Sequence, residues 1–423
     1  MGREEAAAVV TTVASRLSDA TAVAAVAGAP DNQLDALPEP MPVWRPDTLG
    51  DGHPGIALLF AELAAGDAAY RAVAHRHLTA ATGVVRGSRP RLFRGAAALA
   101  FAGHAAATAY GGYAEMLERL DRHIAARVVE RCRETVTAVR AGQPVGADER
   151  YDVISGVAGL GRYLLARGDA ALTDVLEGLV AIALAPDVRV DGVSTAAWLS
   201  GAGDKACVNL GLAHGVAGPL ALLAVSRLAG HRVAGQDEAI AAIVAILRRW
   251  RTTDGSGPYW PLWAGVTDHR GWSPPERGRD AWCYGAAGIG RALFLAGAAL
   301  DRTDWQADGC EAVIGAIATA SDETLHDPGL CHGWSGLLQI ALRMLADTRD
   351  ERYELAAGSL AARVLDAYDP GSPFGFRYVQ SVAPRPADRP GFLDGAAGVA
   401  LALHAYATGV PPRTSWDAAL LLT

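Results

Sequence analysis

The stretch HGWSGLLQIALRML (residues 332–345) contains the pattern that decides the fold. A polar residue precedes a glycine, a second glycine follows three positions later, and an apolar run then continues at helical spacing. The pattern occurs seven times along the 423 residues, which indicates a repeat architecture. The second copy has Ala98 where the others have their second glycine. The first glycines, 43 to 70 residues apart, are Gly52, Gly95, Gly156, Gly215, Gly285, Gly333 and Gly395.

Two kinds of helix are expected to alternate. The motif helices are rich in alanine, leucine and glycine and nearly uncharged, so we expect them to be buried on most sides. The stretches between them are amphipathic, as in residues 113–141, 235–252 and 351–369. The sequence therefore predicts an all-α protein with residues 1–423 as one domain. We expect an α/α toroid of seven helical-hairpin repeats, in which the inner helices start at the G-x-x-G.

Two segments break the helical pattern. Residues 253–280 and 370–390 are rich in glycine, proline and aromatic residues, and each precedes a motif copy. We expect both to be non-helical loops at the rim where the motif helices begin, and rim loops often contact substrates. The alternative is that they are plain crossovers. Trp260, Trp263 and Trp272 of the first segment either contact a peptide or simply pack.

Composition excludes several function classes. The net charge is -8, and the chain has no run of lysine and arginine, which argues against nucleic-acid binding. We find no apolar stretch long enough for a transmembrane segment, and the start, MGREEAAAVVTT, lacks the basic region of a signal peptide. A cytoplasmic protein is therefore expected. In that compartment the five cysteines favour metal binding or catalysis over disulfides.

Alignment of the copies on their first glycine brings two cysteines into register. Cys283 and Cys331 occupy the same position in consecutive copies, and His332 follows Cys331. Equivalent positions of adjacent repeats are neighbours in a closed ring, so we expect the three side chains to meet. Two cysteines and a histidine are the protein ligands of an open zinc site, with a fourth position left for water or substrate. The alternative is a buried structural cysteine and a capping or core histidine.

The motifs WCYG (residues 282–285), CHG (331–333), AHGVAG (213–218) and GFLDGAAGVALAL (391–403) together resemble the lanthionine synthetase C family of peptide cyclases. The resemblance extends over all seven repeats and is closest to the free-standing type of cyclase. It implies an α/α toroid with one catalytic Zn²⁺ per chain, held by Cys283, Cys331 and His332. The family's further active-site residues fall on four positions of this sequence: His214, Asp152, Arg279 and Tyr284.

The implied reaction adds a cysteine thiol to dehydroalanine or dehydrobutyrine within one dehydrated precursor peptide, giving a lanthionine or methyllanthionine thioether in lanthipeptide biosynthesis. Zinc would supply the thiolate, because a coordinated thiol is deprotonated. His214 is then expected to protonate or stabilise the enolate, while Asp152 either deprotonates the thiol or orients His214. Arg279 either binds the enolate oxygen or pairs with Asp280 or Glu276, and Tyr284 either bonds a ligand or packs. A separate dehydratase is the expected source of the substrate.

Other functions remain as alternatives. Zinc-dependent prenyl transfer also activates a thiol, but it needs a basic diphosphate pocket, and Lys205 is the only lysine. Carbohydrate-active toroids need paired carboxylates in the cavity, and Asp51 and Asp394 are the obvious pair in motif register. A third alternative is a peptide- or thiol-binding protein of the same family with structural zinc and no cyclase activity.

Overall fold

The computed structural model describes residues 2–34, 40–85, 89–146, 150–190, 193–199, 206–265, 276–379 and 385–423. Lys205 and Trp272 lie outside these ranges. The chain divides into two compact units. The first unit comprises residues 1–88, 93–120 and 321–416, and the second comprises residues 89–92, 121–320 and 417–423. We describe each unit by itself.

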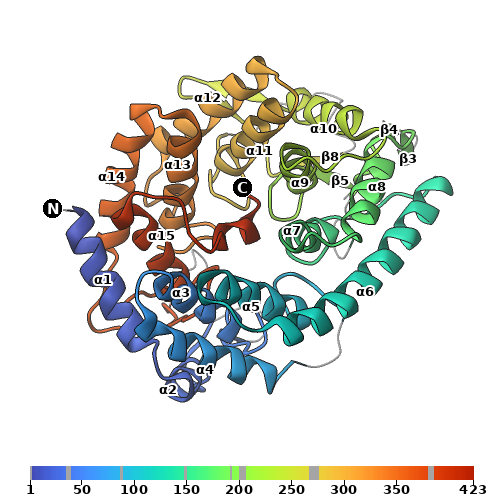
Figure 1. Ribbon diagram of the computed structural model, residues 1–423. Helices are drawn as coiled ribbons and strands as arrows, with labels where there is room; N and C mark the ends of the chain where they lie inside the picture. Colours follow the sequence, from blue (N-terminus) through green and yellow to red (C-terminus); the bar gives the residue numbers. More distant parts are fainter. Residues whose placement is uncertain are drawn as a thin grey trace. The chain divides into compact units, whose positions relative to one another are not determined.

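The first unit is built from helices that pack in pairs. Helix α3 packs on α4 and α5, α13 packs on α14 and α15, and α1 packs against α15, as the blue-to-teal and orange-to-red ribbons of Figure 1 show. One short antiparallel pair, β1 (Gln33–Leu34) with β2 (Met41–Pro42), accompanies them. The helices are α1 (Gly2–Arg16), α2 (Ala20–Ala27), α3 (His53–Ala64), α4 (Arg71–Thr82), α5 (Ala96–Tyr110), α13 (Trp334–Thr348), α14 (Glu351–Asp366) and α15 (Ala396–Thr408), with the 3-10 turn η1 (Ala68–Tyr70).

The second unit combines helices with short hairpins. Helix α11 packs on both α12 and α9, and α7 packs on α8 and α9. Strands β3, β5 and β6 pair antiparallel with β4, β8 and β7, respectively. Its helices are α7 (Val157–Arg167), α8 (Leu172–Ala183), α9 (Ala217–Leu228), α10 (Gln236–Arg249), α11 (Ala286–Ala299) and α12 (Thr303–Thr319). Its strands are β3 (Val188–Val190), β4 (Val193–Thr195), β5 (Cys207–Asn209), β6 (Thr252–Asp254), β7 (Gly257–Tyr259) and β8 (Trp263–Gly265). Helix α6 (Ala114–Arg140) has residues in both units, as does the 3-10 turn η3 (Trp416–Leu420).

Each copy of the sequence motif starts a helix. The motif helices are α3, α5, α7, α9, α11, α13 and α15, and the first glycine of the copy is the N-cap in all of them except α9, which starts two residues after Gly215. Every residue of α3 is buried, whereas α10 and α14 bury only one face. The predicted contrast between buried and amphipathic helices is therefore confirmed.

The second glycine of the motif has a steric cause. A Cβ atom on Gly288 would collide with the main-chain carbonyl oxygen of Trp282, six residues earlier, and Gly159 faces the carbonyl of Val153 in the same way. A side chain at either position would push the start of the helix away from the loop before it. The motif thus lets this loop lie directly against the first turn of its helix.

The two segments predicted to be non-helical contain no helix in their described parts. Residues 253–265 contribute to β6, β7 and β8, and residues 370–379 and 385–390 form turns with one isolated bridge between Tyr378 and Ala387. Trp260 is buried and its indole N–H donates to the carbonyl of Leu247 at 2.7 Å, so this tryptophan packs. Trp263, by contrast, is 53% exposed.

Among the described helices, none is by itself long and apolar enough to cross a membrane. Helices α1 and α2, bent by 88°, satisfy the length and composition criterion only as a pair.

Candidate active site

His214 and Asp152 form the shortest contact between predicted site residues. In the second unit, Asp152 lies in the loop before α7 and His214 in the loop before α9. The imidazole Nδ1 is 2.6 Å from Asp152 Oδ2. Asp152 is fully buried, and its Oδ1 accepts the backbone N–H of Ser155 at 2.9 Å. The His214 side chain keeps 36% of its surface exposed. The pair thus joins a fixed carboxylate to an accessible imidazole.

Burial raises the pKa of Asp152, and hydrogen bonds from His214 and from the backbone of Ser155 offset part of that rise. The proton of the contact lies between Nδ1 and Oδ2. Nε2 is the ring nitrogen that does not contact Asp152. This is the arrangement in which a carboxylate orients a histidine for proton transfer.

Tyr284 is held by a residue that the sequence analysis did not select. Asn209 Nδ2 donates to the Tyr284 hydroxyl at 3.1 Å, while Asn209 Oδ1 accepts the backbone N–H of Gly211 at 3.0 Å. The exposed ring of Trp263 stands edge-on to Tyr284 with centroids 6.2 Å apart. A recurrent polar residue could have revealed this role, since Asn209 precedes Gly215 by the same number of positions as Asp327 precedes Gly333.

Arg277 fixes the loop before Cys283. Arg277 donates to Asp280 at 2.6 Å and to Asp254 at 2.7 Å. Asp280 Oδ1 in turn accepts the N–H of Ala286 at 2.6 Å, at the start of α11. Asp280 thus binds Arg277. Arg279 lies half-buried in the same loop, and its role stays a prediction. Cys283 follows this loop and is buried.

Cys331 and His332 occupy the corresponding loop of the first unit, before α13. The imidazole Nε2 of His332 lies 3.1 Å from the Tyr378 hydroxyl and 3.4 Å from Asp327 Oδ2. Its Nδ1 lies 3.7 Å from Asp394 Oδ1. The histidine is thus surrounded by oxygen atoms from three separate segments of the chain.

Asp51 and Asp394, the carboxylate pair of the carbohydrate alternative, share one arginine. Arg389 forms ion pairs with both, at 3.1 Å to Asp394 and with a short contact to Asp51. Its guanidinium also stacks over the ring of Tyr378, 4.6 Å from the centroid. Two carboxylates neutralised by one buried cation are typical of a structural ion pair. This arrangement does not favour the carbohydrate alternative.

Backbone hydrogen bonds join the loops of different copies at equivalent or adjacent positions. In the second unit, the N–H of Ala213 donates to its equivalent, Cys283, and the N–H of Val153, which lies one position earlier in its own copy, donates to Ala213. In the first unit, the N–H of Cys331 donates to Leu393, and that of Leu393 donates to Gly50. The backbone N···O distances of these four hydrogen bonds are 3.0 to 3.2 Å. The premise of the register argument therefore holds within each unit.

The side chains offer two sets of metal ligands. Cys283, Cys331 and His332 could together hold a metal ion, and so could Asp327, His332 and Asp394, whose ligand atoms lie within 4.8 Å of one another. Arg389 binds Asp394 and disfavours a cation beside that carboxylate. Thiolates and an imidazole are the ligand types that suit Zn²⁺. The first set is the better match to the predicted ion.

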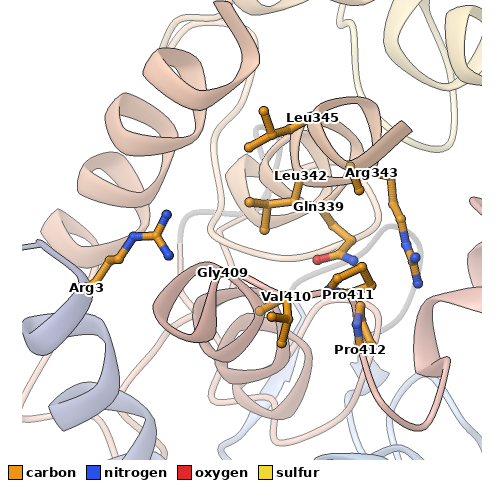
Figure 2. Close-up of a pocket in the computed structure, with 11 residues that line it drawn as sticks. Arg3, Gln339, Leu342, Arg343, Leu345, Gly409, Val410, Pro411 and Pro412 are labelled. Atoms are coloured by element: carbon orange, nitrogen blue, oxygen red, sulfur yellow. The ribbon is translucent and has the colours of Figure 1, made fainter. Parts of the chain in front are cut away.

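The remaining candidates have ordinary structural surroundings. Burial raises the pKa of the Cys132 thiol on α6 to about 12, so it is unreactive at neutral pH. His53, which follows the first glycine of the first copy, is buried against His77. Figure 2 shows a pocket of about 70 Å³ in the first unit, where α13 meets the turn after α15; none of its described lining residues is a predicted site residue.

Comparison with known proteins decides the family. Residues 43–421 match the family model described as lanthionine synthetase C-like protein. The chain belongs to this family. The nisin biosynthesis protein NisC of Lactococcus lactis subsp. lactis is 26% identical over 404 residues, which cover 89% of this chain and 88% of that protein. A solved structure of nisin cyclase matches with a TM-score of 0.70 and 23% identity, covering 89% of this chain and 92% of the other.

These matches confirm three of the predictions from sequence. The resemblance to the lanthionine synthetase C family is confirmed by the family model. The fold class is confirmed, since nisin cyclase is an α/α toroid. The enzyme class expected from the motifs, a lanthipeptide cyclase, is the class that these relatives support. The single-domain assignment and the roles of the individual site residues stay predictions.

Proposed function

We propose that this LanC-like protein is a zinc-dependent lanthipeptide cyclase that closes thioether rings in a dehydrated precursor peptide. The observation that carries the proposal is the 2.6 Å contact between His214 and Asp152, in a chain that also has both cysteines and the histidine of the predicted metal site. Its substrate is a peptide with free cysteines and dehydroalanine or dehydrobutyrine, which a separate dehydratase supplies. We expect the reaction to occur in the cytoplasm, without nucleic acid as a partner.

The metal ligands in this proposal are Cys283, Cys331 and His332. Support comes from the hydrogen bonds that link equivalent loop positions of consecutive copies, because Cys283 and Cys331 are equivalent residues of the fifth and sixth copies. When bound, Zn²⁺ supplies the substrate cysteine as a thiolate. Two protein thiolates also make the centre electron-rich, which favours sulfur chemistry over activation of water.

In this scheme His214 transfers the proton that the reaction delivers to the peptide. The substrate sulfur bonds to Cβ of the dehydro residue while the electron pair of the C=C bond moves towards the carbonyl as an enolate. The proton lost from the thiol is balanced by one delivered to Cα. His214 first takes up a proton at Nε2, with its Nδ1–H held by Asp152, and as the imidazolium it then donates from Nε2 to Cα. Asp152 orients His214 rather than acting on the thiol, since it is fully buried and both its oxygens are hydrogen-bonded.

Tyr284 and Arg279 complete the proposed site. The Tyr284 hydroxyl accepts a hydrogen bond from Asn209, which fixes the position of a group that can itself donate. A phenol and a guanidinium are both suited to an enolate oxygen, where negative charge develops in the transition state. We assign these two residues to that oxygen.

Metal analysis tests the ligand set. The wild-type protein is expected to bind one zinc ion per chain, and Cys283→Ala and Cys331→Ala should each lose it. Zinc retained at full stoichiometry by both variants would contradict the assignment. The alternative is a binding protein with structural zinc, and it predicts a different result. The zinc-loaded wild type would bind a dehydrated peptide, but mass spectrometry after alkylation would show that all thiols of the peptide are still free.

A further inference from the structure

The two ring nitrogens of His332 have different surroundings. Nε2 faces two oxygen atoms, Tyr378 Oη at 3.1 Å and Asp327 Oδ2 at 3.4 Å. Nδ1 faces one, Asp394 Oδ1, at 3.7 Å, which exceeds hydrogen-bond length. A neutral histidine carries its proton on one nitrogen only, so these surroundings select where that proton sits.

Asp327 is held in place by the loop that also carries His332. The residue is only 2% exposed, and its Oδ1 accepts the backbone N–H of Gly329 at 2.7 Å. Its main-chain oxygen accepts the N–H of Trp334 at the start of α13. A buried carboxylate is stable only when donors face it. His332 Nε2 lies 3.4 Å from Asp327 Oδ2 and is placed to approach it as such a donor, since an ionised carboxylate can only accept.

Tyr378 is held from the opposite side by Arg389, whose guanidinium lies 4.6 Å from the ring centroid. The same guanidinium binds Asp394 at 3.1 Å. Arg389 therefore does two things: it supports the ring that contacts Nε2, and it neutralises the one carboxylate that faces Nδ1. Both effects favour a proton on Nε2, which places the lone pair of the neutral ring on Nδ1.

We propose that Asp327 and Tyr378 are positioning residues that fix the tautomer of His332, with the proton on Nε2 and Nδ1 as the zinc-binding nitrogen. This inference rests on the proposed function, in which His332 is a zinc ligand. Histidine ligands of metals commonly donate their second ring N–H to a carboxylate, which fixes the ring and raises its basicity. Asp327 is the carboxylate placed for that role.

Zinc affinity of the metal-free protein, measured by competition with a chromophoric chelator, tests the inference without any activity assay. Asp327→Asn replaces an acceptor with an amide that can donate to Nε2, which favours a proton on Nδ1. We expect the zinc affinity to fall by about 10- to 100-fold in Asp327→Asn, and by about 10-fold in Tyr378→Phe. The second variant keeps the test informative if the first fails to fold.

Glu62→Gln is the matched control, because Glu62 is a buried carboxylate of the same unit that binds the backbone of Arg413 and Thr414 instead. It should change thermal stability and leave zinc affinity at the wild-type value. If Asp327→Asn and Tyr378→Phe both fold and both bind zinc with the wild-type affinity, the tautomer inference is wrong. The proposed ligand set would be unaffected by that result. Wild-type affinity in His332→Ala would overturn the proposed ligand set, and the inference with it.

Discussion

Asp152 performs two tasks with its two oxygens. One oxygen caps the loop before α7 by accepting the N–H of Ser155, and the other holds His214. Asp152 is thus both a loop carboxylate and the partner of His214. The geometry satisfies both, because a buried carboxylate can accept from several donors at once.

The orienting role predicts the effect of Asp152→Asn. An asparagine keeps the size of the side chain, but its amide can turn a donor towards His214 Nδ1 and select the wrong tautomer. We expect single-turnover cyclisation to slow by about 10²- to 10⁴-fold, the usual range for lost acid–base catalysis. Zinc content should stay at one per chain. Asp237→Asn, which removes an ion pair with Arg227 on the protein surface, is the control expected to cyclise normally.

An unaltered rate in Asp152→Asn would show that His214 needs no partner. A lost zinc ion would show that the substitution acts through folding of the site.

The sequence identified the residues whose position in the repeat was informative. Cys283, Cys331 and His332 stood out because they align with one another across copies. Asn209 and Asp327 also share a register, six positions before the first glycine of their copies, but they were not selected; residues of irregular segments have no such register. Tyr378, for example, contacts His332 across 46 positions and lies in an irregular segment.

At the scale of elements, the helices were predictable and the strands were not. Helix α6 and the amphipathic helices α10 and α14 follow from apolar residues at every third or fourth position. The hairpins have strands of two or three residues, which is too short for a period-2 pattern to be recognised. Their pairing depends on tertiary interactions, as when Arg277 holds Asp254 of β6.

The interface between α3 and α4 contains a pair of buried histidines. His53 Nδ1 and His77 Nδ1 are 3.1 Å apart, and His77 Nε2 lies 2.9 Å from the carbonyl of Leu17, with Arg76 and Asp19 as the nearby charges. Burial lowers the pKa of each histidine to about 4. The rings form one proton-sharing contact as long as both are uncharged.

This pair predicts loss of stability in mild acid. Unfolded histidines titrate near pH 6.5 and these two near 4, so the unfolded chain binds more protons as the pH falls through that window. Lowering the pH to 5 should cost about 2 kcal/mol of unfolding free energy per histidine. We expect denaturant unfolding of metal-free protein to show this loss, and His53→Gln to reduce it. Equal pH dependence in the variant and the wild type would rule out the pair as its source.

At the scale of the whole molecule, the repeat count and the fold class could be predicted from the sequence alone, because the same motif starts a buried helix in each copy. The glycines that admit a neighbouring carbonyl recur at every copy but the second, where Ala98 stands. The division of the chain into two compact units did not follow, since the motif spacing continues through both. It arises from how densely the helices pack, which periodicity does not encode.

The most direct test of the account is cyclisation of a dehydrated precursor peptide by the zinc-loaded protein, with free thiols counted by alkylation and mass spectrometry. The account predicts that alkylatable thiols disappear without a change in peptide mass with the wild type, and persist with His214→Ala although that variant still binds zinc. Thiols that persist with the zinc-loaded wild type, or that disappear equally fast with His214→Ala, would contradict it.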